Sequence, residues 1–264
     1  MSFLFSEFIY KPIYNLLVLV YNYLPWADFG LAIIIVTILI KLILLPINKK
    51  QIESQKKMQE LQPKIKAIQE KHKNDKEKQS RAIMELYKDH KTNPFSGCLP
   101  MIVQLIFLIA FYRVLFNISQ NNLTIESSGL YSFVQNPGQI KHYFLGIINL
   151  SKSIDFKSLT LMSIPHLILV ILAAGSQYYQ TKMMMPKNDI KSIDKAKSKP
   201  KDLDFAQVMT KQMLYLGPLL TLFIGVKFPA GLALYWLVST LFMIGQQIYI
   251  ERKELAKAPI KDKS

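Results

Sequence analysis

The chain has 264 residues, half of them hydrophobic, and carries a formal net charge of +15 at pH 7. Its hydrophobic residues are gathered in long, nearly uncharged blocks, which predicts a polytopic membrane protein with one membrane domain and not a soluble globular protein. The basic residues lie beside these blocks, which argues against nucleic-acid binding as the reason for the charge. The single cysteine, Cys98, excludes an internal disulfide framework.

Residues 1–28 are apolar with a narrow polar stripe. Glu7, Lys11, Asn15 and Asn22 fall within about 80° of one another on a helical wheel. Such a stripe favours an external amphipathic helix lying in the membrane interface. A membrane-spanning helix remains the alternative.

Residues 29–47 form the first predicted span, and Lys41 is its one charged residue. Lys41 lies roughly 9 Å inside the stretch, at 1.5 Å per residue. A lysine near mid-bilayer costs about 2.5–3.5 kcal/mol by insertion scales. Either its stem lies along lipid while the ammonium reaches the interface, or the side chain faces a water-filled cavity. Thr37, one turn earlier on the same face, favours the polar surface.

Residues 48–93 are polar, with 13 Lys/Arg and 7 Asp/Glu. Apolar residues recur in this segment at near-helical spacing. We therefore expect a cytoplasmic helical hairpin with a turn at Lys73–Lys76, in which Pro63 bends the first helix. A solvated charged linker is the alternative.

The rest of the chain alternates between apolar and polar segments, and Gly217-Pro218 is expected to interrupt the fourth span. Within the second basic loop, residues 187–204 are expected to be flexible. The predicted segments are span 2 at 94–117, an external loop at 118–158, span 3 at 159–180, a cytoplasmic basic loop at 181–211, span 4 at 212–227, span 5 at 228–250 and a cytoplasmic basic tail at 251–264.

The loop charges predict the orientation of the chain. With five spans, one side of the membrane holds 26 Lys/Arg and the other holds 5. The positive-inside rule places the basic hairpin and the C-terminus in the cytoplasm and the N-terminus outside.

The predicted spans contain no Asp or Glu, which argues against a carboxylate proton relay or cation site in the membrane. His166 has no acidic or cysteine neighbour, and no phosphate-binding glycine loop is present. We therefore expect no enzymatic activity, cofactor, metal site or small-molecule substrate. Neutral polar residues around Lys41 predict a hydrated, mildly positive surface inside the bilayer. These residues are Thr37, Gln104, Ser176, Gln177, Ser239, Gln246 and Gln247, the last two being the best candidates for interhelical hydrogen bonds.

Two motifs carry a family resemblance. The first runs from Asn93 to Pro100 as NPFSGCLP and is followed by Gln104; the second runs from Phe228 to Trp236 as FPAGLALYW and is followed by Gln246-Gln247. Both resemble segments of the YidC/Oxa/Alb membrane protein insertases, of the short bacterial type that lacks an extra N-terminal span and a large periplasmic domain. The motif positions are Asn93, Pro94, Gly97, Cys98, Pro100, Pro229, Gly231 and Tyr235. The resemblance implies an all-α fold of five spans around a groove that is open to the cytoplasm and to lipid.

The resemblance also implies the function: insertion and folding of nascent membrane proteins in the bacterial plasma membrane, alone or with the Sec translocon. Implied partners are nascent chains, the lipid bilayer, the ribosome through its rRNA, and the signal recognition particle pathway. The implied groove residues are Lys41, Thr37, Gln104, Ser176, Gln177, Trp236 and Ser239. The family usually has Arg where this chain has Lys41, so the charge is kept but the planar five-donor fork is lost. A small transporter or channel with a midplane solute site is the alternative, and an assembly factor that does not require Lys41 is a third class.

Overall fold

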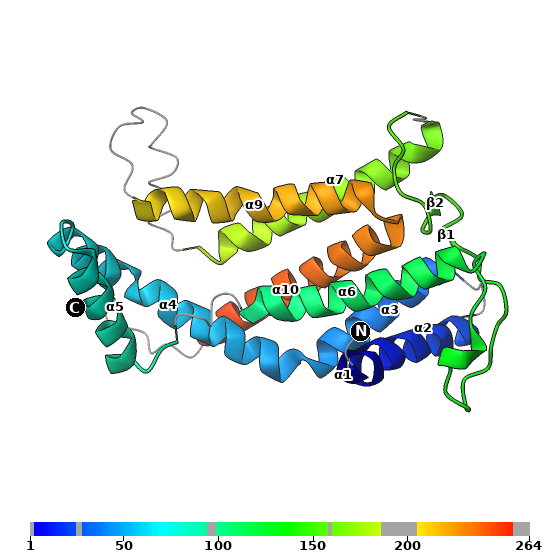
Figure 1. Cartoon of the computed structure of the whole chain (residues 1–264), viewed down its shortest axis with the longest axis horizontal. Coiled ribbons are helices and arrows are strands. Elements are labelled where there is room, and N and C mark those ends of the chain that lie inside the picture. Colours follow the sequence, from blue (N-terminus) through cyan, green and yellow to red (C-terminus); the bar gives the residue numbers. More distant parts are fainter. Residues whose placement is uncertain (1–2, 25–27, 94–98, 158–159, 186–204, 256–264) are drawn as a thin grey trace. The chain divides into compact units, whose positions relative to one another are not determined.

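A computed structural model describes residues 3–24, 28–93, 99–157, 160–185 and 205–255 (Figure 1). The described chain is helical apart from a two-stranded hairpin and one isolated bridge, so the all-α expectation needs that small amendment. The elements are α1 (Phe3–Phe5), a π-helical turn η1 (Ser6–Tyr10), α2 (Lys11–Tyr23), α3 (Phe29–Ile43), α4 (Leu45–Lys71), α5 (Lys76–Asp89), α6 (Leu99–Gln120), η3 (Ser127–Gly129), β1 (Tyr143–Phe144), β2 (Ile148–Asn149), η4 (Leu161–Ser163), α7 (Ile164–Met183), α9 (Phe205–Lys227) and α10 (Ala230–Leu255).

The chain divides into two compact units. The membrane unit comprises residues 1–43, 105–180 and 215–264, and the hairpin unit comprises residues 44–104 and 181–214. The polar segment between the first two predicted spans thus belongs to a different unit from most of the apolar blocks.

Three described helical stretches are long and apolar enough to cross a membrane, namely Phe3–Tyr23, Ile102–Gln120 and Ala230–Lys253. The broken pair of α3 and α4 makes a fourth, while Leu214–Lys227 is apolar but shorter. By length and composition the described residues therefore give three or four spans. The N-terminal segment is among them, so the spanning alternative for it stays open.

The first predicted span, residues 29–47, contains a helix break. The helix α3 ends at Ile43, and α4 begins at Leu45 with Pro46 in its first turn, so the expectation that Pro46 closes the helix of this span is wrong. Pro46 has no backbone N–H to donate to the carbonyl of Leu42, but a proline is well tolerated in the first turn of a new helix. Pro46 therefore opens the second helix and does not close the first.

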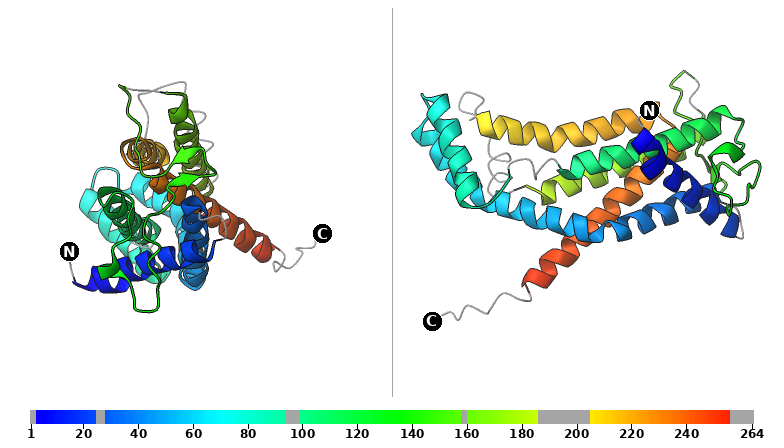
Figure 2. Two further views of the ribbon diagram at one scale, coloured as in Figure 1. Left: turned by 90° about the vertical axis from the view of Figure 1, so that its right-hand side faces the viewer. Right: turned by 60° about the horizontal axis from the view of Figure 1, so that its bottom comes forward.

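The core of the membrane unit is built around α3, which packs against both α2 and α10 (Figures 1 and 2). Phe29, Ile33 and Val36 recur every three or four residues on α3 and are almost completely buried. On α6, the ring of Phe111 stacks on that of Tyr235 in α10, with the centroids 4.3 Å apart. Burial of this stripe supplies the main force that holds α3 in place.

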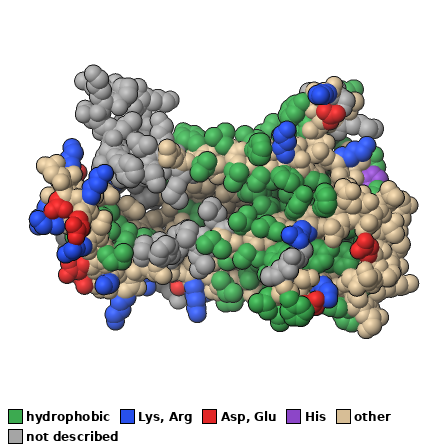
Figure 3. All heavy atoms as spheres, in the orientation of Figure 1, with side chains coloured by type: hydrophobic (Ala, Val, Ile, Leu, Met, Phe, Trp, Pro, Cys, Tyr) green, Lys and Arg blue, Asp and Glu red, His purple; other side chains and the backbone are tan. Residues whose placement is uncertain are grey.

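The outer surface of the membrane unit suits contact with lipid. Figure 3 shows hydrophobic side chains gathered over α6 and α9. Leu216 and Phe223 on α9 are 65% and 61% exposed, and Ile168 and Ile171 on α7 are also exposed. A soluble protein rarely exposes apolar patches of this kind, whereas in a bilayer they lie among acyl chains.

Two asparagines in the polar stripe of the N-terminal helix form hydrogen bonds with the loop between α6 and α7. Asn15 is only 2% exposed; its amide nitrogen donates to the carbonyls of Lys11 (2.8 Å) and Gly129 (2.9 Å), and its oxygen accepts from the backbone N–H of Tyr131 (2.6 Å). Asn22 donates to the carbonyl of Gln135 at 2.6 Å. Two of the four residues of the stripe therefore bind the loop between α6 and α7, a contact that the stripe alone did not predict.

Two tyrosines of α2 extend this attachment. The Tyr14 hydroxyl accepts from the backbone N–H of Glu126 at 2.9 Å and donates to its carbonyl at 3.2 Å. The Tyr21 hydroxyl accepts from the backbone N–H of Lys141 at 2.9 Å. The loop thus forms hydrogen bonds with α2 from Tyr14 to Asn22.

Asn15→Ala is expected to loosen this attachment. The substitution removes the partner of a backbone N–H at Tyr131 and a carbonyl at Gly129, which costs about 1–3 kcal/mol for each group left unsatisfied. Hydrogen–deuterium exchange at the amides of residues 129–131 measures the effect. Asn22→Ala, at an exposed position on the same helix, is the control and should perturb these amides less. Equal protection in Asn15→Ala and the wild type would contradict the expected role of Asn15.

The interruption predicted at Gly217-Pro218 is also wrong. The helix α9 runs without a break from Phe205 to Lys227, with Pro218 inside it. The Thr221 hydroxyl donates to the carbonyl of Gly217 at 3.0 Å. Threonine side chains of this kind help to satisfy backbone groups near a proline, which is why prolines are tolerated in membrane helices.

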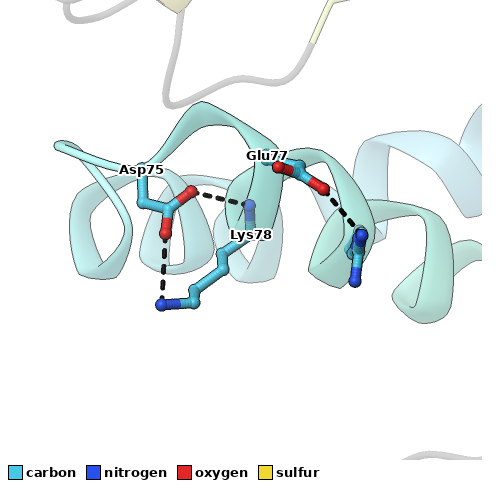
Figure 4. Close-up of polar contacts among 4 residues, drawn as sticks. Asp75, Glu77 and Lys78 are labelled. Atoms are coloured by element: carbon cyan, nitrogen blue, oxygen red, sulfur yellow. Dashed lines mark hydrogen bonds and ion pairs between the residues drawn. The ribbon is translucent and has the colours of Figure 1, made fainter.

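In the hairpin unit, α4 and α5 pack against each other and are joined by the turn at residues 72–75. Pro63 lies within α4, which continues to Lys71, and Leu61 and Ile65 are buried beside it. Asp75 is the N-cap of α5; its carboxylate accepts from the backbone N–H of Lys78 (3.0 Å) and pairs with the Lys78 ammonium (3.2 Å) (Figure 4). The segment predicted to be flexible, residues 187–204, lies outside the described residues.

The start of α5 is expected to depend on pH through Asp75. The hydrogen bond from the Lys78 backbone lowers the pKa of the Asp75 carboxyl below its usual value. A carboxyl whose pKa is lower in the folded state stabilises the fold above its unfolded pKa, about 3.9, and this contribution is lost as the pH falls through the folded pKa. Amide exchange at residues 76–79 should therefore accelerate at acid pH in the wild type. In Asp75→Asn the cap is kept without titration, so an identical pH dependence in that variant would contradict the assignment.

Candidate functional site

Lys41 lies in the last turn of α3 with its side chain against protein. It is 7% exposed, whereas the next two residues, Leu42 and Ile43, are 46% and 73% exposed. A stem lying along lipid would be exposed like these neighbours, so the burial favours the polar-surface interpretation of Lys41. The C-terminal end of a helix carries partial negative charge, which makes this position less costly for an ammonium group.

Thr37 lies one turn before Lys41 on the same face of α3, the helix that packs against α10. It is 1% exposed, and its hydroxyl donates to the carbonyl of Ile33 at 2.6 Å. Thr37 thus places a polar group beside Lys41 while its own donor is used within the helix. This back-bond is a common way to bury a threonine in a helix.

A second polar group joins α7 to α10. The side-chain oxygen of Gln177 accepts from the Trp236 indole N–H at 3.0 Å and from the Thr240 hydroxyl at 3.4 Å. Ser176, next to Gln177, donates to the carbonyl of Ala173 at 2.8 Å. The structure therefore brings together Gln177 and Trp236, two predicted groove residues that are 59 positions apart.

The remaining polar residues of α10 are buried. Ser239 is 1% exposed, and Gln246 and Gln247 are nearly as buried. Gln247 donates to Glu251 at 3.1 Å, one turn later in the same helix. Since α10 also packs against α3, the membrane unit has a polar interior to which α3, α7 and α10 all contribute.

The first family motif is only partly described. Gln104 is half-buried on the part of α6 that belongs to the hairpin unit, so it lies in a different unit from Lys41. Asn93 precedes the gap, and Pro100 falls in the first turn of α6. Pro94, Gly97 and Cys98 lie outside the described residues.

The second motif builds the corner between α9 and α10. Pro229 lies between the two helices, and the backbone N–H of Gly231 donates to the carbonyl of Leu150 at 3.0 Å. A Cβ on Gly231 would lie 3.0 Å from a methyl of Leu115 and 3.3 Å from the carbonyl oxygen of Leu150, so the backbone at Gly231 is closely packed. Tyr235 is 2% exposed and stacked on Phe111. Gly231 and Tyr235 are thus packed against neighbouring elements, and Trp236 follows directly in α10.

Sequence reasoning missed three contacts. Thr240, one turn after Trp236, joins the Gln177 group, and that spacing could have indicated it. Asp28 caps α3 by accepting from the backbone N–H groups of Gly30 (2.8 Å) and Leu31 (3.1 Å); an aspartate before an apolar run is the usual signal for such a cap. His166 is buried, and its Nε2 lies 3.1 Å from the carbonyl oxygen of Gly225 in α9, a pairing that no local pattern indicates.

The described residues offer no group of three or more His, Cys, Asp or Glu side chains that could hold a metal ion. The polar interior described above has one lysine together with hydroxyl, amide and indole groups. The neutral groups can form hydrogen bonds, and the ammonium group attracts negative charge.

The comparison with known proteins agrees with the motifs. A family model described as the 60Kd inner membrane protein matches residues 19–257. The membrane protein insertase YidC of Citrifermentans bemidjiense is 35% identical over 244 residues, which are 92% of this chain and 36% of that protein. The same-named protein of Streptomyces avermitilis is 35% identical over 86% of this chain and 52% of its own length. The same-named protein of Fusobacterium nucleatum is 33% identical over 86% of this chain and 88% of its own length.

The chain thus spans about a third to a half of the first two relatives and most of the third. The apolar helices and these relatives agree on a multi-pass protein of the bacterial inner membrane. With a family model matched over nearly its whole length, the chain belongs to the 60Kd inner membrane protein family, the YidC/Oxa/Alb family that its motifs resemble.

Proposed function

We propose that this protein is a membrane insertase that transfers polar segments of nascent membrane proteins across the bilayer, and that it is not an enzyme. The observation that carries the proposal is the burial of Lys41, at 7% exposure, on a face of α3 that it shares with Thr37. A buried cation in a membrane span is costly and usually marks a path for a substrate or an ion. The names of the relatives, membrane protein insertase YidC, agree with this function.

In the proposed mechanism, Lys41 and the Gln177–Trp236 pair line a hydrated groove among five spans. An acidic segment of the nascent chain is attracted by the ammonium of Lys41, and the amide and hydroxyl groups replace part of its hydration shell. This lowers the cost of moving the segment through the membrane. The apolar part of the substrate leaves into lipid along α7 and α10.

The hairpin unit is proposed to receive the nascent chain on the cytoplasmic side. Figure 3 shows Lys, Arg, Asp and Glu side chains over the hairpin of α4 and α5, so this hairpin has a charged surface. The excess of Lys and Arg suits a contact with rRNA or with targeting factors. Cooperation with the Sec translocon is part of the same proposal.

The function is tested by depletion. The protein is depleted in its host, and the newly made membrane proteins that fail to insert are identified by protease protection. We expect single-span proteins with short acidic extracellular tails to be affected first, with recovery when the wild-type chain is restored. Normal insertion of every such substrate after complete depletion would overturn the proposal.

The proposed orientation has its own test. Ser80 in α5 and Ser128 in η3 are both exposed, and cysteines at these positions on a Cys98→Ser background should react from opposite sides of the membrane. A membrane-impermeant maleimide added to intact spheroplasts is expected to label Ser128→Cys and to label Ser80→Cys only after lysis. Labelling of both before lysis would contradict the positive-inside assignment.

A further inference from the structure

The short hairpin of β1 and β2 has an unusual turn. Tyr143 pairs with Asn149 and Phe144 pairs with Ile148, and the backbone N–H of Ile147 donates to the carbonyl of Phe144 at 3.0 Å. The two residues at the centre of the turn both have positive φ, 51° at Leu145 and 70° at Gly146. The two φ values and the hydrogen bond match those of a type I′ turn, in which Asn, Asp or Gly is strongly preferred at the first central position. A leucine there is conformationally unfavourable and calls for a reason other than the turn itself.

The side chains at this turn are apolar and exposed. Leu145 is 63% exposed, Ile147 is 59% exposed and Tyr143, on the adjoining strand, is 40% exposed. A surface turn normally carries polar residues, since these favour the turn and are well hydrated. The hairpin tip, defined as Leu145–Ile147, thus presents two large apolar side chains at a site where local structure favours neither.

Two contacts fix the hairpin tip to the start of α3. The backbone N–H of Leu145 donates to Oδ2 of Asp28 at 2.8 Å, while Oδ1 of the same carboxylate caps α3. Phe144 packs on Gly30 so closely that a Cβ on Gly30 would lie 2.3 Å from its ring. The tip is therefore held within hydrogen-bonding distance of the residue that precedes the first apolar turn of α3.

The hairpin adjoins one end of a candidate membrane span. The backbone N–H of Gly231, in the first turn of α10, donates to the carbonyl of Leu150, the residue after β2, at 3.0 Å. The stretch Ala230–Lys253 of α10 is long and apolar enough to cross a membrane. Because the hairpin is attached to the start of this stretch, we expect its tip to lie near the level at which the stretch enters the bilayer.

Positive charge flanks the hairpin. Lys141 precedes β1 and Lys152 follows β2, and both side chains are exposed. Burial, and secondly the nearby Lys152, lower the pKa of His142, so that this ring is neutral at pH 7 and the two lysines supply the charge. An apolar tip between two exposed lysines, with Tyr143 beside it, has the composition of a segment that inserts into an anionic leaflet.

We propose that the hairpin tip, Leu145–Ile147, inserts into the adjacent lipid leaflet and anchors the capped end of α3 there, with Lys141 and Lys152 meeting anionic headgroups. This lipid-binding site is separate from the polar interior and does not depend on the transfer of substrates. In a purified system it can therefore be tested apart from the insertase function.

The test uses the full chain on a Cys98→Ser background, with a nitroxide label at Ile147→Cys or, as the control, at Ser128→Cys. The protein is reconstituted alone in vesicles of phosphatidylethanolamine and phosphatidylglycerol, and collision rates with oxygen and with a water-soluble nickel chelate are measured. We expect the label at Ile147 to collide mainly with oxygen and the label at Ser128 mainly with nickel. Equal nickel accessibility at the two positions would overturn the proposal. If the label at Ile147 were shielded from nickel only in native membranes and not in the vesicles, the proposal would also be overturned, because that result indicates a protein partner.

A second variant separates lipid insertion from turn formation. Leu145→Asn provides a preferred residue for the type I′ turn, so the hairpin should be retained, but the apolar tip is halved. We expect the Ile147 label to lose oxygen collisions and gain nickel collisions in this variant, and the wild-type preference for oxygen to be weaker in neutral phosphatidylcholine vesicles. An unchanged Ile147 profile in Leu145→Asn would show that Leu145 is not part of an anchor.

Discussion

Lys41→Gln is expected to leave the membrane unit folded and to impair insertion of substrates with acidic extracellular tails far more than of substrates with neutral tails. The variant should fold because removing a buried charge relieves its desolvation cost. It should lose activity because two opposite charges about 4 Å apart are worth about 4 kcal/mol at an effective dielectric constant of 20, against about 1 kcal/mol in bulk water. The loss should therefore grow with each acidic residue in the tail, while Lys41→Arg, which keeps the charge, should retain function.

The measurement is insertion of one single-span substrate whose tail acids are removed one by one. Lys227→Gln is the matched control, because Lys227 also lies in the last turn of a helix but its side chain is exposed. The control removes one positive charge without touching the polar interior and should follow the wild type across the series. If Lys41→Gln inserted the whole series as well as Lys227→Gln does, the charge of Lys41 would have no part in insertion.

Gly225→Ala is expected to weaken the pairing of α7 with α9. A Cβ at Gly225 would lie 2.8 Å from one methyl of Val170 and 3.0 Å from the other, and a β-branched side chain in a helix has little freedom to turn away. Overpacking of this kind typically costs about 1–3 kcal/mol, and Gly225→Val should cost more. The neighbouring contact between His166 and the carbonyl of Gly225 would be disturbed at the same time.

Thermal unfolding in detergent measures this effect, with Gly175→Ala as the control. Gly175 is an exposed glycine of α7, and a Cβ there meets nothing within 4 Å, so alanine should be neutral or slightly stabilising. The expected order of unfolding temperature is Gly175→Ala at or above the wild type, then Gly225→Ala, then Gly225→Val. Identical unfolding of the two alanine variants would mean that the close approach at Gly225 contributes nothing to stability.

The features that sequence alone predicted are those fixed by local composition. Apolar blocks define the membrane helices, and Lys41 stands out as a candidate site because it is the single charge in one of them. The break at Leu44 was missed because a proline at the end of an apolar run can equally well end one helix or begin the next.

The features that sequence missed depend on partners distant in the chain. The polar stripe of α2 suggests a membrane interface, because nothing near Asn15 indicates that its amide binds the backbone at Gly129 and Tyr131. The Gln177–Trp236 hydrogen bond likewise joins residues far apart in the chain, so no local pattern indicates it. Hydrogen bonds between segments tens of residues apart are set by tertiary packing, which a pattern of local spacing does not encode.

The attachment of the α6–α7 loop to α2 also has a consequence for the biogenesis of the protein itself. Asn15 obtains its tertiary partners only after Gly129 and Tyr131 have been synthesised. At about 5–20 residues per second, this delay is roughly 6–23 s of translation. During that time the nascent N-terminal helix carries asparagine amides that lack their final partners, so it is poorly suited to settle alone in lipid. An early intermediate with a loosely associated N-terminal helix should therefore precede the native state.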